Sequence, residues 1–370
     1  MPDHDVAIVG AGPVGLLLAC LLAQRGIDAA VFEAREGADG RSRAIGIHPP
    51  GWAALDAAGL GPAVRAEALA LDGGEVICGG RVLVSLTFDE HRRVLILPQH
   101  RTDELLRARL SEIAPHALRL GRAVTGVQDG GAVVRVSLET THEATASFVV
   151  AADGVRSGIR RRLGIGWMPR PGAGGYAMAD VPDAARGARA QLYCEQDGLV
   201  ESFPMPGGRR RWVASDPHRA LDDAERFANA IHARTGMRPE LPAGMRPTAF
   251  RAQQHRASRL VAGRIVLVGD AAHETSPIGG QGMNLGWAAA VRLAAVIERS
   301  LRTGRADLGS YEKHTLASAA RAQRRSLFYM TMGRPARGPA LPVRNAAIRL
   351  LGTAPLRGRT ADMITMRGTG

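Results

Sequence analysis

The sequence contains little cysteine. Cys20, Cys78 and Cys194 are its three cysteines, and no two of them form a C-x-x-C pair. This excludes a disulfide framework, an iron–sulfur cluster and a cysteine-based zinc site. We therefore predict no metal centre, and a reducing, cytoplasmic compartment is the default expectation.

Lysine and aromatic residues are also scarce. The formal net charge is +13, from 48 Lys and Arg against 35 Asp and Glu, and Lys313 is the single lysine. Nucleic-acid binding is a poor explanation of this charge, because the arginines are spread along the chain and aromatic residues, which stack on bases, make up only 4%. We predict no nucleic-acid partner, and the arginine-rich surface instead favours anionic ligands.

Long hydrophobic runs are absent apart from one at residues 6–23. Asp3 and Asp5 precede this run, where a signal peptide requires basic residues, and Gly10 and Gly12 interrupt it, where a membrane-spanning helix is continuous. The run therefore predicts a strand, a turn and a helix, and we expect no membrane span.

The glycines of this run have the spacing of a dinucleotide-binding turn. Gly10-x-Gly12-x-x-Gly15 separates an apolar strand at residues 5–9 from an apolar helix, and a second strand at residues 27–32 ends at Glu33. The glycines permit a tight turn and close approach of a pyrophosphate, which the helix N-terminus stabilises. Glu33 can bind a ribose but would repel a 2′-phosphate, so the pattern indicates FAD or NAD.

Two further strand ends carry polar or glycine-rich motifs. An apolar strand at residues 264–269 ends at Asp270, and the glycine-rich segment 277–284 then opens a helix. Between the first and last motifs, a strand at residues 148–152 ends at Asp153-Gly154. Motifs at the ends of parallel strands meet in one crevice, so we expect all three to contact one cofactor.

With these motifs, the chain resembles the FAD-dependent aromatic hydroxylases, the para-hydroxybenzoate hydroxylase-like single-component flavin monooxygenases. The resemblance runs from about residue 5 to about residue 330 and includes the segments 41–48 and 97–105. It implies a set of FAD-contacting residues: Gly10, Gly12, Pro13, Val14, Gly15, Glu33, Ala34, Arg35, Arg43, Gln99, Arg101, Val124, Asp153, Gly154, Asp270, Pro277, Gly280, Gly282, Met283 and Asn284.

The resemblance also implies a reaction. In this family NADH or NADPH reduces FAD, O2 adds at flavin C4a to give a hydroperoxide, and the distal oxygen passes to an aromatic or polyketide-like ring. The protein must keep water from that intermediate and orient the ring. The substrate, the hydroxylated position, the choice of nicotinamide, the alternatives of epoxidation or Baeyer–Villiger oxidation, and a monomer or homodimer all remain open.

The fold class expected is α/β, with a Rossmann-like FAD-binding domain, an inserted antiparallel β-sheet domain for substrate and C-terminal helices. The FAD-binding domain comprises residues 1–75, 98–165 and 262–300, and the sheet domain residues 76–97 and 166–261. We predict a hairpin of residues 82–88 with 94–97. A helical segment spans 301–370, helical and basic at 309–332 and broken by prolines after that.

Pocket candidates come from this sheet and from the glycine-rich segment 277–284, which the resemblance places at the flavin ring and which is called the flavin loop below. Tyr193, Arg210 and Trp212 are expected in the roof over the flavin, and His48 and Pro277 near its ring, although Tyr193 and Trp212 have the alternation of core residues. Glu201 and His273 are further pocket candidates, although Glu201 is expected rather to face solvent and His273 to brace a loop. The run Arg160–Arg162 is expected on a solvated face, with a structural role of Arg160 in its motif as the alternative.

Rival functions share the same scaffold. Flavin-dependent halogenases require a tunnel lysine and a W-x-W-x-I-P segment, but Lys313 lies in the predicted C-terminal helix and Trp212 lacks that context. An FAD-dependent reductase or dehydrogenase, such as a prenyl-chain saturase, remains an alternative, as does a non-catalytic FAD-binding partner protein. Oxygen consumption with and without substrate separates these functions.

Overall fold

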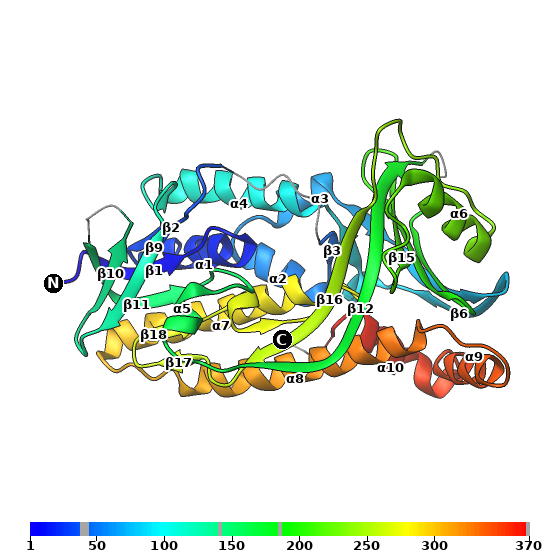
Figure 1. The fold of residues 1–370 in the computed structure, drawn as a ribbon. Helices are drawn as coiled ribbons and strands as arrows, with labels where there is room; N and C mark the ends of the chain where they lie inside the picture. The colour runs from blue at the N-terminus through cyan, green and yellow to red at the C-terminus, as the bar shows by residue number, and fades with distance from the viewer. Residues whose placement is uncertain (38–43, 140–142, 184–186, 368–370) are drawn as a thin grey trace.

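The computed structural model describes residues 1–37, 44–139, 143–183 and 187–367. Two eight-stranded sheets lie at opposite ends of the molecule, joined by long strands and flanked by helices (Figure 1). The mixed α/β architecture with C-terminal helices is the one that the sequence predicts. The segment with Arg43 lies outside the described residues.

The first sheet contains the predicted dinucleotide-binding unit. Its strand order is β17-β18-β11-β1-β2-β8, and β9 joins it through β10. The strands that pair in parallel are β1 (His4–Val9), β2 (Ala29–Phe32), β8 (Leu118–Arg119), β11 (Glu143–Ala151) and β18 (Ile265–Leu267). Antiparallel strands extend it: β9 (Val124–Asp129), β10 (Val134–Leu138) and β17 (Val261–Ala262).

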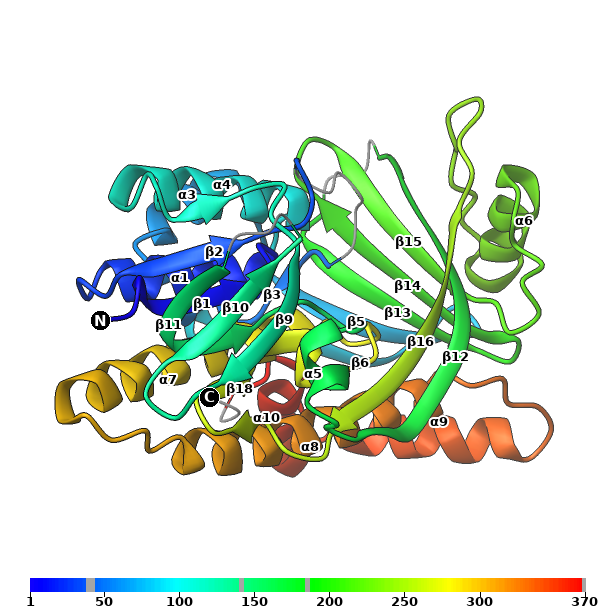
Figure 2. The ribbon, with the colours of Figure 1, turned by 60° about the vertical axis from the view of Figure 1, so that its left-hand side comes forward.

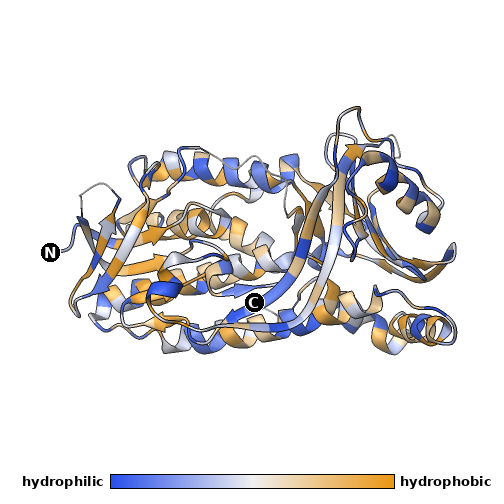
Figure 3. Ribbon diagram, in the orientation of Figure 1, coloured by the Kyte–Doolittle hydropathy of each residue, from blue (hydrophilic) through white to orange (hydrophobic). Residues whose placement is uncertain are grey.

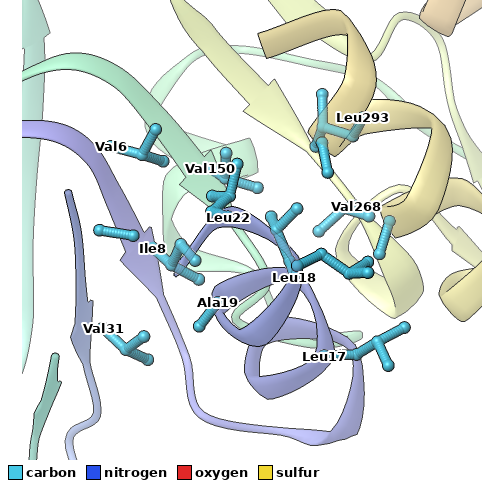
Figure 4. Packing of buried hydrophobic residues seen from close by; sticks show 14 of the residues in the cluster. Val6, Ile8, Leu17, Leu18, Ala19, Leu22, Val31, Val150, Val268 and Leu293 are labelled. Atoms are coloured by element: carbon cyan, nitrogen blue, oxygen red, sulfur yellow. The ribbon is translucent and has the colours of Figure 1, made fainter. Parts of the chain in front are cut away.

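Three helices pack together beside this sheet. They are α1 (Pro13–Ala23), α4 (Gln99–Ile113) and α7 (Gly282–Thr303). Leu18 and Leu22 of α1 are buried among strand residues such as Ile8 and Val150, with Leu293 of α7 nearby (Figure 4). Because these strands are covered on both faces, they are apolar throughout rather than alternating.

The second sheet has the order β19-β16-β12-β15-β14-β13-β5-β6 (Figure 2). Its strands are β5 (Gly73–Cys78), β6 (Arg81–Thr87), β12 (Trp167–Pro182), β13 (Arg189–Glu195), β14 (Gly198–Met205), β15 (Arg209–Ser215), β16 (Thr248–Ala257) and β19 (His273–Glu274). The long strands β12 and β16 run from the first unit into this sheet, so they hold the two units together.

The predicted hairpin of residues 82–88 with 94–97 is wrong. Strand β6 pairs with β5, whereas β7 (Val94–Ile96) pairs with β3 (Gly46–Ile47) and β4 (Leu69–Leu71) in a separate three-stranded sheet. A 3-10 turn at Glu90–Arg92 separates β6 from β7. The long loop lets β7 leave the larger sheet, and residue alternation alone does not define the partner strand.

Helices cover the remaining surfaces. They are α2 (Pro49–Ala57), α3 (Gly61–Glu67), α5 (Gly158–Arg162), α6 (Ala224–Thr235), α8 (Gly309–Met332), α9 (Ala340–Leu351) and α10 (Ala354–Ile364). The expected break after residue 332 is therefore only partial. Pro339, Pro342 and Pro355 all lie at or within the first turn of a helix, where a missing N–H costs nothing.

Hydropathy follows this layering. Apolar residues concentrate along the central strands of the first sheet, and polar residues on the outer helix faces (Figure 3). Within the described ranges, every helix is too short or too polar to cross a lipid bilayer.

Candidate functional site

The three predicted motifs meet at one edge of the first sheet. Val9 of β1 pairs with Ala151 of β11, which pairs with Leu267 of β18, and all three strands end there in parallel. The turn at Gly10, the segment at Asp153 and the 3-10 turn Gly269–Ala271 consequently lie side by side. This is the edge at which open α/β sheets bind their ligands.

The glycines of the first turn have distinct roles. Gly10 has φ +104°, and a Cβ there would lie 2.6 Å from the carbonyl oxygen of Ala152. A Cβ on Gly15 would lie 2.1 Å from the carbonyl oxygen of Gly10. At Gly12 a Cβ would have no atom within 4 Å, so the protein leaves open space beside this backbone. Pro13 then begins α1, which leaves the N–H groups of the first turn available to a phosphate.

Glu33 lies at the end of β2, close to this turn. Its buried carboxylate accepts hydrogen bonds from the backbone N–H of Ala11 (2.8 Å) and from the Arg35 N–H (3.0 Å) and Nε (2.8 Å). Burial alone would raise its pKa, but these bonds outweigh burial and hold the pKa below its usual value. Ala34 and Arg35 are exposed beside it. Half-buried Val124 begins β9 two residues after Arg122, whose N–H donates to the Glu33 carbonyl (2.8 Å).

Helix α4 contributes a residue that the sequence motifs did not reveal. The Nη2 group of Arg107 donates to the carbonyl oxygen of Ala11 (3.3 Å), and its Nε is buried without a hydrogen-bond partner in the described chain. In the sequence, its position one residue after the buried Leu106 is all that indicates that Arg107 lies near the inner face of the helix. By contrast, Arg101 has a bidentate contact with Glu67 and also contacts Glu104.

Gln99, at the start of the same helix, contacts Ala44, which lies just before β3. Its Oε1 accepts from the Ala44 N–H (3.4 Å), and its own N–H donates to the Ala44 carbonyl (3.0 Å). A cavity of about 440 Å³ opens between this helix start and the turn from β14 to β15, lined among others by Pro98, Arg101 and Arg209.

The second motif is built around Asp153. One carboxylate oxygen accepts from the Ile159 N–H (3.2 Å), and the other is buried without a partner among the described residues. Gly154 has φ +77°, which a residue with a side chain rarely adopts. Arg160 donates to the carbonyl of Ala271 (2.9 Å) and stacks on the Trp167 ring, so it joins the second motif to the third. It is buried, so the solvated face expected for this run is wrong at Arg160, and the alternative structural role is the one observed.

The third motif combines an exposed acid with a braced loop. Asp270 and Pro277 are exposed. Asn284 accepts from the His48 N–H (2.9 Å) and donates to the carbonyls of Gly280 (2.8 Å) and Gly46 (3.0 Å). Its side chain therefore holds the loop in shape. Gly282 and half-buried Met283, in the first turn of α7, present backbone N–H groups at that place.

Two buried histidines flank this loop. His48 is 7% exposed, and a Cβ on Gly280 would lie 3.1 Å from its Nε2. Burial lowers the pKa of His48 to about 4 and that of His273 to about 4, so both rings are neutral at pH 7. Neither ring nitrogen of His273 has a hydrogen-bond partner in the described structure, so this residue does not brace the loop through polar contacts.

Tyr193 and Trp212, which the sequence places in the roof over the flavin, lie on the face of the second sheet that points away from the flavin loop. Both are buried in a cluster with Phe227 and Ile231 of α6, on the side away from the flavin loop. Arg210 points to this face too, where it contacts Asp183 (2.6 Å) and Ser202 (2.9 Å). Their strand alternation reflects a second hydrophobic core between α6 and the sheet, and we withdraw these residues as pocket candidates.

The opposite face of this sheet looks toward the flavin loop. Tyr176, Met178 and Val213 pack there with Ile278, which directly follows Pro277, and with Met330 of α8. Glu201 is on this face and is only 3% exposed, so the expectation that it faces solvent is wrong. Burial raises its pKa to about 8.

Comparison with known proteins identifies this arrangement. The family described as FAD binding domain matches residues 3–326. The chain belongs to this family. It is 34% identical over 315 residues to 12-dehydrotetracycline 5-monooxygenase/anhydrotetracycline 6-monooxygenase of Streptomyces rimosus, covering 78% of this chain and 61% of that protein. It is 30% identical over 335 residues to a 3-(3-hydroxy-phenyl)propionate/3-hydroxycinnamic acid hydroxylase of Burkholderia vietnamiensis, covering 85% and 60%.

Solved structures agree with this family assignment. Anhydrotetracycline hydroxylase from Streptomyces rimosus superposes with a TM-score of 0.80 at 28% identity, covering 99% of this chain and 76% of that one. p-Nitrophenol 4-monooxygenase from Pseudomonas putida, at 22% identity, shares the fold with a TM-score of 0.84 over 99% and 98%. The resemblance to FAD-dependent aromatic hydroxylases is thereby confirmed. The chain spans about three-fifths of the length of the curated relatives above.

The residues present fit the FAD that defines this family. The open space beside Gly12 admits a pyrophosphate, and the unpartnered oxygen of Asp153 is a free acceptor at the same edge. Glu33 keeps its charge, which suits a ribose diol. Within the described ranges, no group of three or more His, Cys, Asp or Glu side chains is placed to hold a metal ion.

Proposed function

We propose that this chain is an FAD-dependent monooxygenase that uses NADH or NADPH and O2 to insert one oxygen atom into an aromatic or polyketide-like ring. The observation that carries the proposal is the position of the flavin loop, residues 277–284. It connects the cofactor edge of the first sheet to the apolar inner face of the second. The names of the relatives support the same reaction class.

The chain's own residues supply binding, orientation and exclusion of water. FAD, when bound, supplies the electron transfer and the activation of oxygen. The first turn and α1 would hold its pyrophosphate, with Glu33 at the ribose of its adenosine half and Asp270 at its sugar-alcohol chain. Tyr176, Met178 and Ile278 would form a dry wall against which a flat ring packs.

The same proposal divides the chain by function. Residues 1–75, 98–165 and 262–300 would form the FAD-binding unit, residues 76–97 and 166–261 the substrate unit, and residues 301–370 a C-terminal helical segment. Strand β7 (Val94–Ile96) is an exception within 76–97, because it pairs with β3 and β4 of the FAD-binding unit. We further propose a cytoplasmic location, where NAD(P)H is available, and a small aromatic molecule as the substrate.

The test uses the purified protein supplied with FAD. We expect it to retain FAD, and we expect hydroxylated aromatics or polycyclic quinones to accelerate both NAD(P)H oxidation and O2 uptake. The product should be heavier by one oxygen atom, and isotopically heavy O2 should deliver the label. NAD(P)H oxidation with no labelled product from any ring class would indicate a reductase instead. A protein that takes up no FAD would overturn the cofactor assignment itself.

A further inference from the structure

Glu201 occupies a position where the strand pattern requires an apolar residue. On β14 it alternates with Leu199 and Phe203, and in register across the sheet it lies between Leu192 of β13 and Val213 of β15. The next strand places Met178 beside Val213 in the same row. A single carboxyl group therefore lies in the middle of an apolar surface.

This carboxyl group has no hydrogen bond or ion pair in the described structure, although it is only 3% exposed. The other buried charges of the sheet are paired: Arg210 contacts Asp183, and Arg211 contacts Asp180 through two hydrogen bonds. Burying a carboxyl group without a partner costs folding free energy. Folding stability therefore does not explain why a glutamate occupies this position, whereas the binding of a polar ligand at this face does.

The face that bears Glu201 is continuous with the flavin loop. Tyr176, whose pKa is raised by burial and also by the nearby Glu201, packs in one cluster with Ile278 and Met330. The same loop contacts α8, because a Cβ on Gly279 would lie 2.6 Å from the Tyr329 ring. An aromatic ring bound between the flavin loop and the sheet would therefore have the flavin loop on one side and Glu201 on the other.

We propose that Glu201 binds a hydroxyl substituent of the aromatic substrate and accepts its proton. The substrate O–H bond breaks, a carboxyl O–H bond forms, and the ring oxygen keeps the electron pair, which raises electron density at the ortho and para carbons. The substrate class is accordingly a phenol or hydroxyquinone rather than an unsubstituted or fully methylated ring. This inference rests on the proposed function, because it assigns the ring to this face.

Few charges surround this group. Arg211 and Asp180 lie on the same face as Glu201, next to Val213 and Met178 along their strands, and they are paired with each other. Glu201 acts electrostatically on Tyr176 and Cys194, and burial raises the pKa of both. Arg334 and Arg344 act on those two groups, and desolvation is the single cause of the shift at Glu201. The pKa of about 8 lies close to working pH, which is where a general base is most effective.

The test measures proton transfer directly, without turnover. The FAD-loaded protein is titrated with 4-nitrophenol, whose absorbance reports its own ionisation, with the hydroxylated naphthoquinone juglone, and with 4-nitroanisole, which lacks the O–H group. Glu201→Gln is compared with wild type. Glu75→Gln is the matched control, because Glu75 lies on the opposite face of the same sheet, beside Arg189. Retained FAD absorbance shows that each variant is folded.

We expect wild type and Glu75→Gln to bind the phenols as phenolates and at least tenfold more tightly than 4-nitroanisole. Glu201→Gln should lose both the phenolate spectrum and the preference. An unchanged phenolate spectrum in Glu201→Gln would overturn the proposal, as would failure of wild type to bind either phenol at any pH from 6 to 9. Phenolate binding without oxygen insertion would leave this inference standing while rejecting the monooxygenase.

Discussion

Val14, in the first turn of α1, packs directly against Gly286 of α7, such that a Cβ on Gly286 would lie 2.6 Å from Val14 Cγ2. Gly269 also lies against this side chain, with 3.2 Å between Val14 Cγ2 and a Cβ at that position. Two motifs that are more than half the chain apart in sequence are therefore held together by one side chain. This contact fixes the relative position of the two loops that would hold the ends of the cofactor.

The first prediction concerns this contact. Gly286→Ala should lower the stability of the protein by about 1–3 kcal/mol, because the added methyl group meets a branched side chain in a packed interior. The measurement is the thermal unfolding midpoint with and without FAD. Adding Val14→Ala to Gly286→Ala should restore part of the loss, since the second change removes the clashing methyl groups. Strictly additive effects in this double-mutant cycle would show that the two residues are not in contact.

Arg107 provides the second prediction. Arg107→Met should weaken FAD binding about 10- to 100-fold, the equivalent of losing one charge-assisted hydrogen bond worth roughly 1.5–3 kcal/mol near a phosphate. Fluorescence titration of the apoprotein with FAD measures the dissociation constant. Arg109→Met, on the same helix but paired with Glu112, is the control and should bind FAD as wild type does. Equal affinity in both variants would remove Arg107 from the site.

The third prediction is that Tyr193 and Trp212 affect stability and not substrate binding. Trp212→Ala should destabilise the protein by about 3–5 kcal/mol, because the indole fills the core under α6. Tyr193→Phe, which keeps the packing volume, should leave both stability and the KM for an aromatic substrate unchanged. Steady-state kinetics at a temperature where each variant stays folded provide the check. A raised KM in Tyr193→Phe would return that residue to the substrate pocket.

The sequence predicts the cofactor edge well because its signals are local. A strand, a glycine-rich turn and a helix follow one another within the segment around Gly12, so their contacts need no knowledge of distant pairing. Parallel strands then bring Asp153 and Asp270 to the same edge by a general rule of α/β sheets.

The second sheet was harder to predict for a physical reason. Alternation divides β14 and β15 into two faces, but only the three-dimensional position of α6 decides that Trp212 faces a core and Glu201 faces the flavin loop. The pairing of β7 with β3 and β4 is also non-local, and the residues between β6 and β7 allow either partner. Arg107 was missed because its helix has no motif at that residue.

The buried histidines predict acid sensitivity. His48 and His273 bind a proton near pH 6.5 when unfolded but only near pH 4 when folded. The unfolded state therefore binds more protons between these values, and stability falls as the pH drops from about 6.5 to about 4. Each histidine contributes on the order of 3 kcal/mol. Thermal midpoints across this range should fall less steeply in His273→Asn than in wild type, whereas exposed His116→Asn should leave the slope unchanged.

Glu201 predicts a loss of stability on the alkaline side. Its pKa rises from 4.5 to about 8 on folding, so the folded state holds a proton that the unfolded state has released. Stability should therefore decrease as the pH rises from about 4.5 to about 8 and then level off, by on the order of 5 kcal/mol in total.

Glu201→Gln carries no titrating proton, so the difference in thermal midpoint between this variant and wild type should favour the variant progressively from pH 6 to about pH 8 and stay constant above that. Glu75→Gln, on the opposite face of the sheet, should follow wild type throughout. A pH-independent difference between Glu201→Gln and wild type would mean that the carboxyl group is already ionised in the folded protein at pH 6. In that case burial would not raise its pKa, and Glu201 would be a weaker proton acceptor for a ring hydroxyl than the proposal requires.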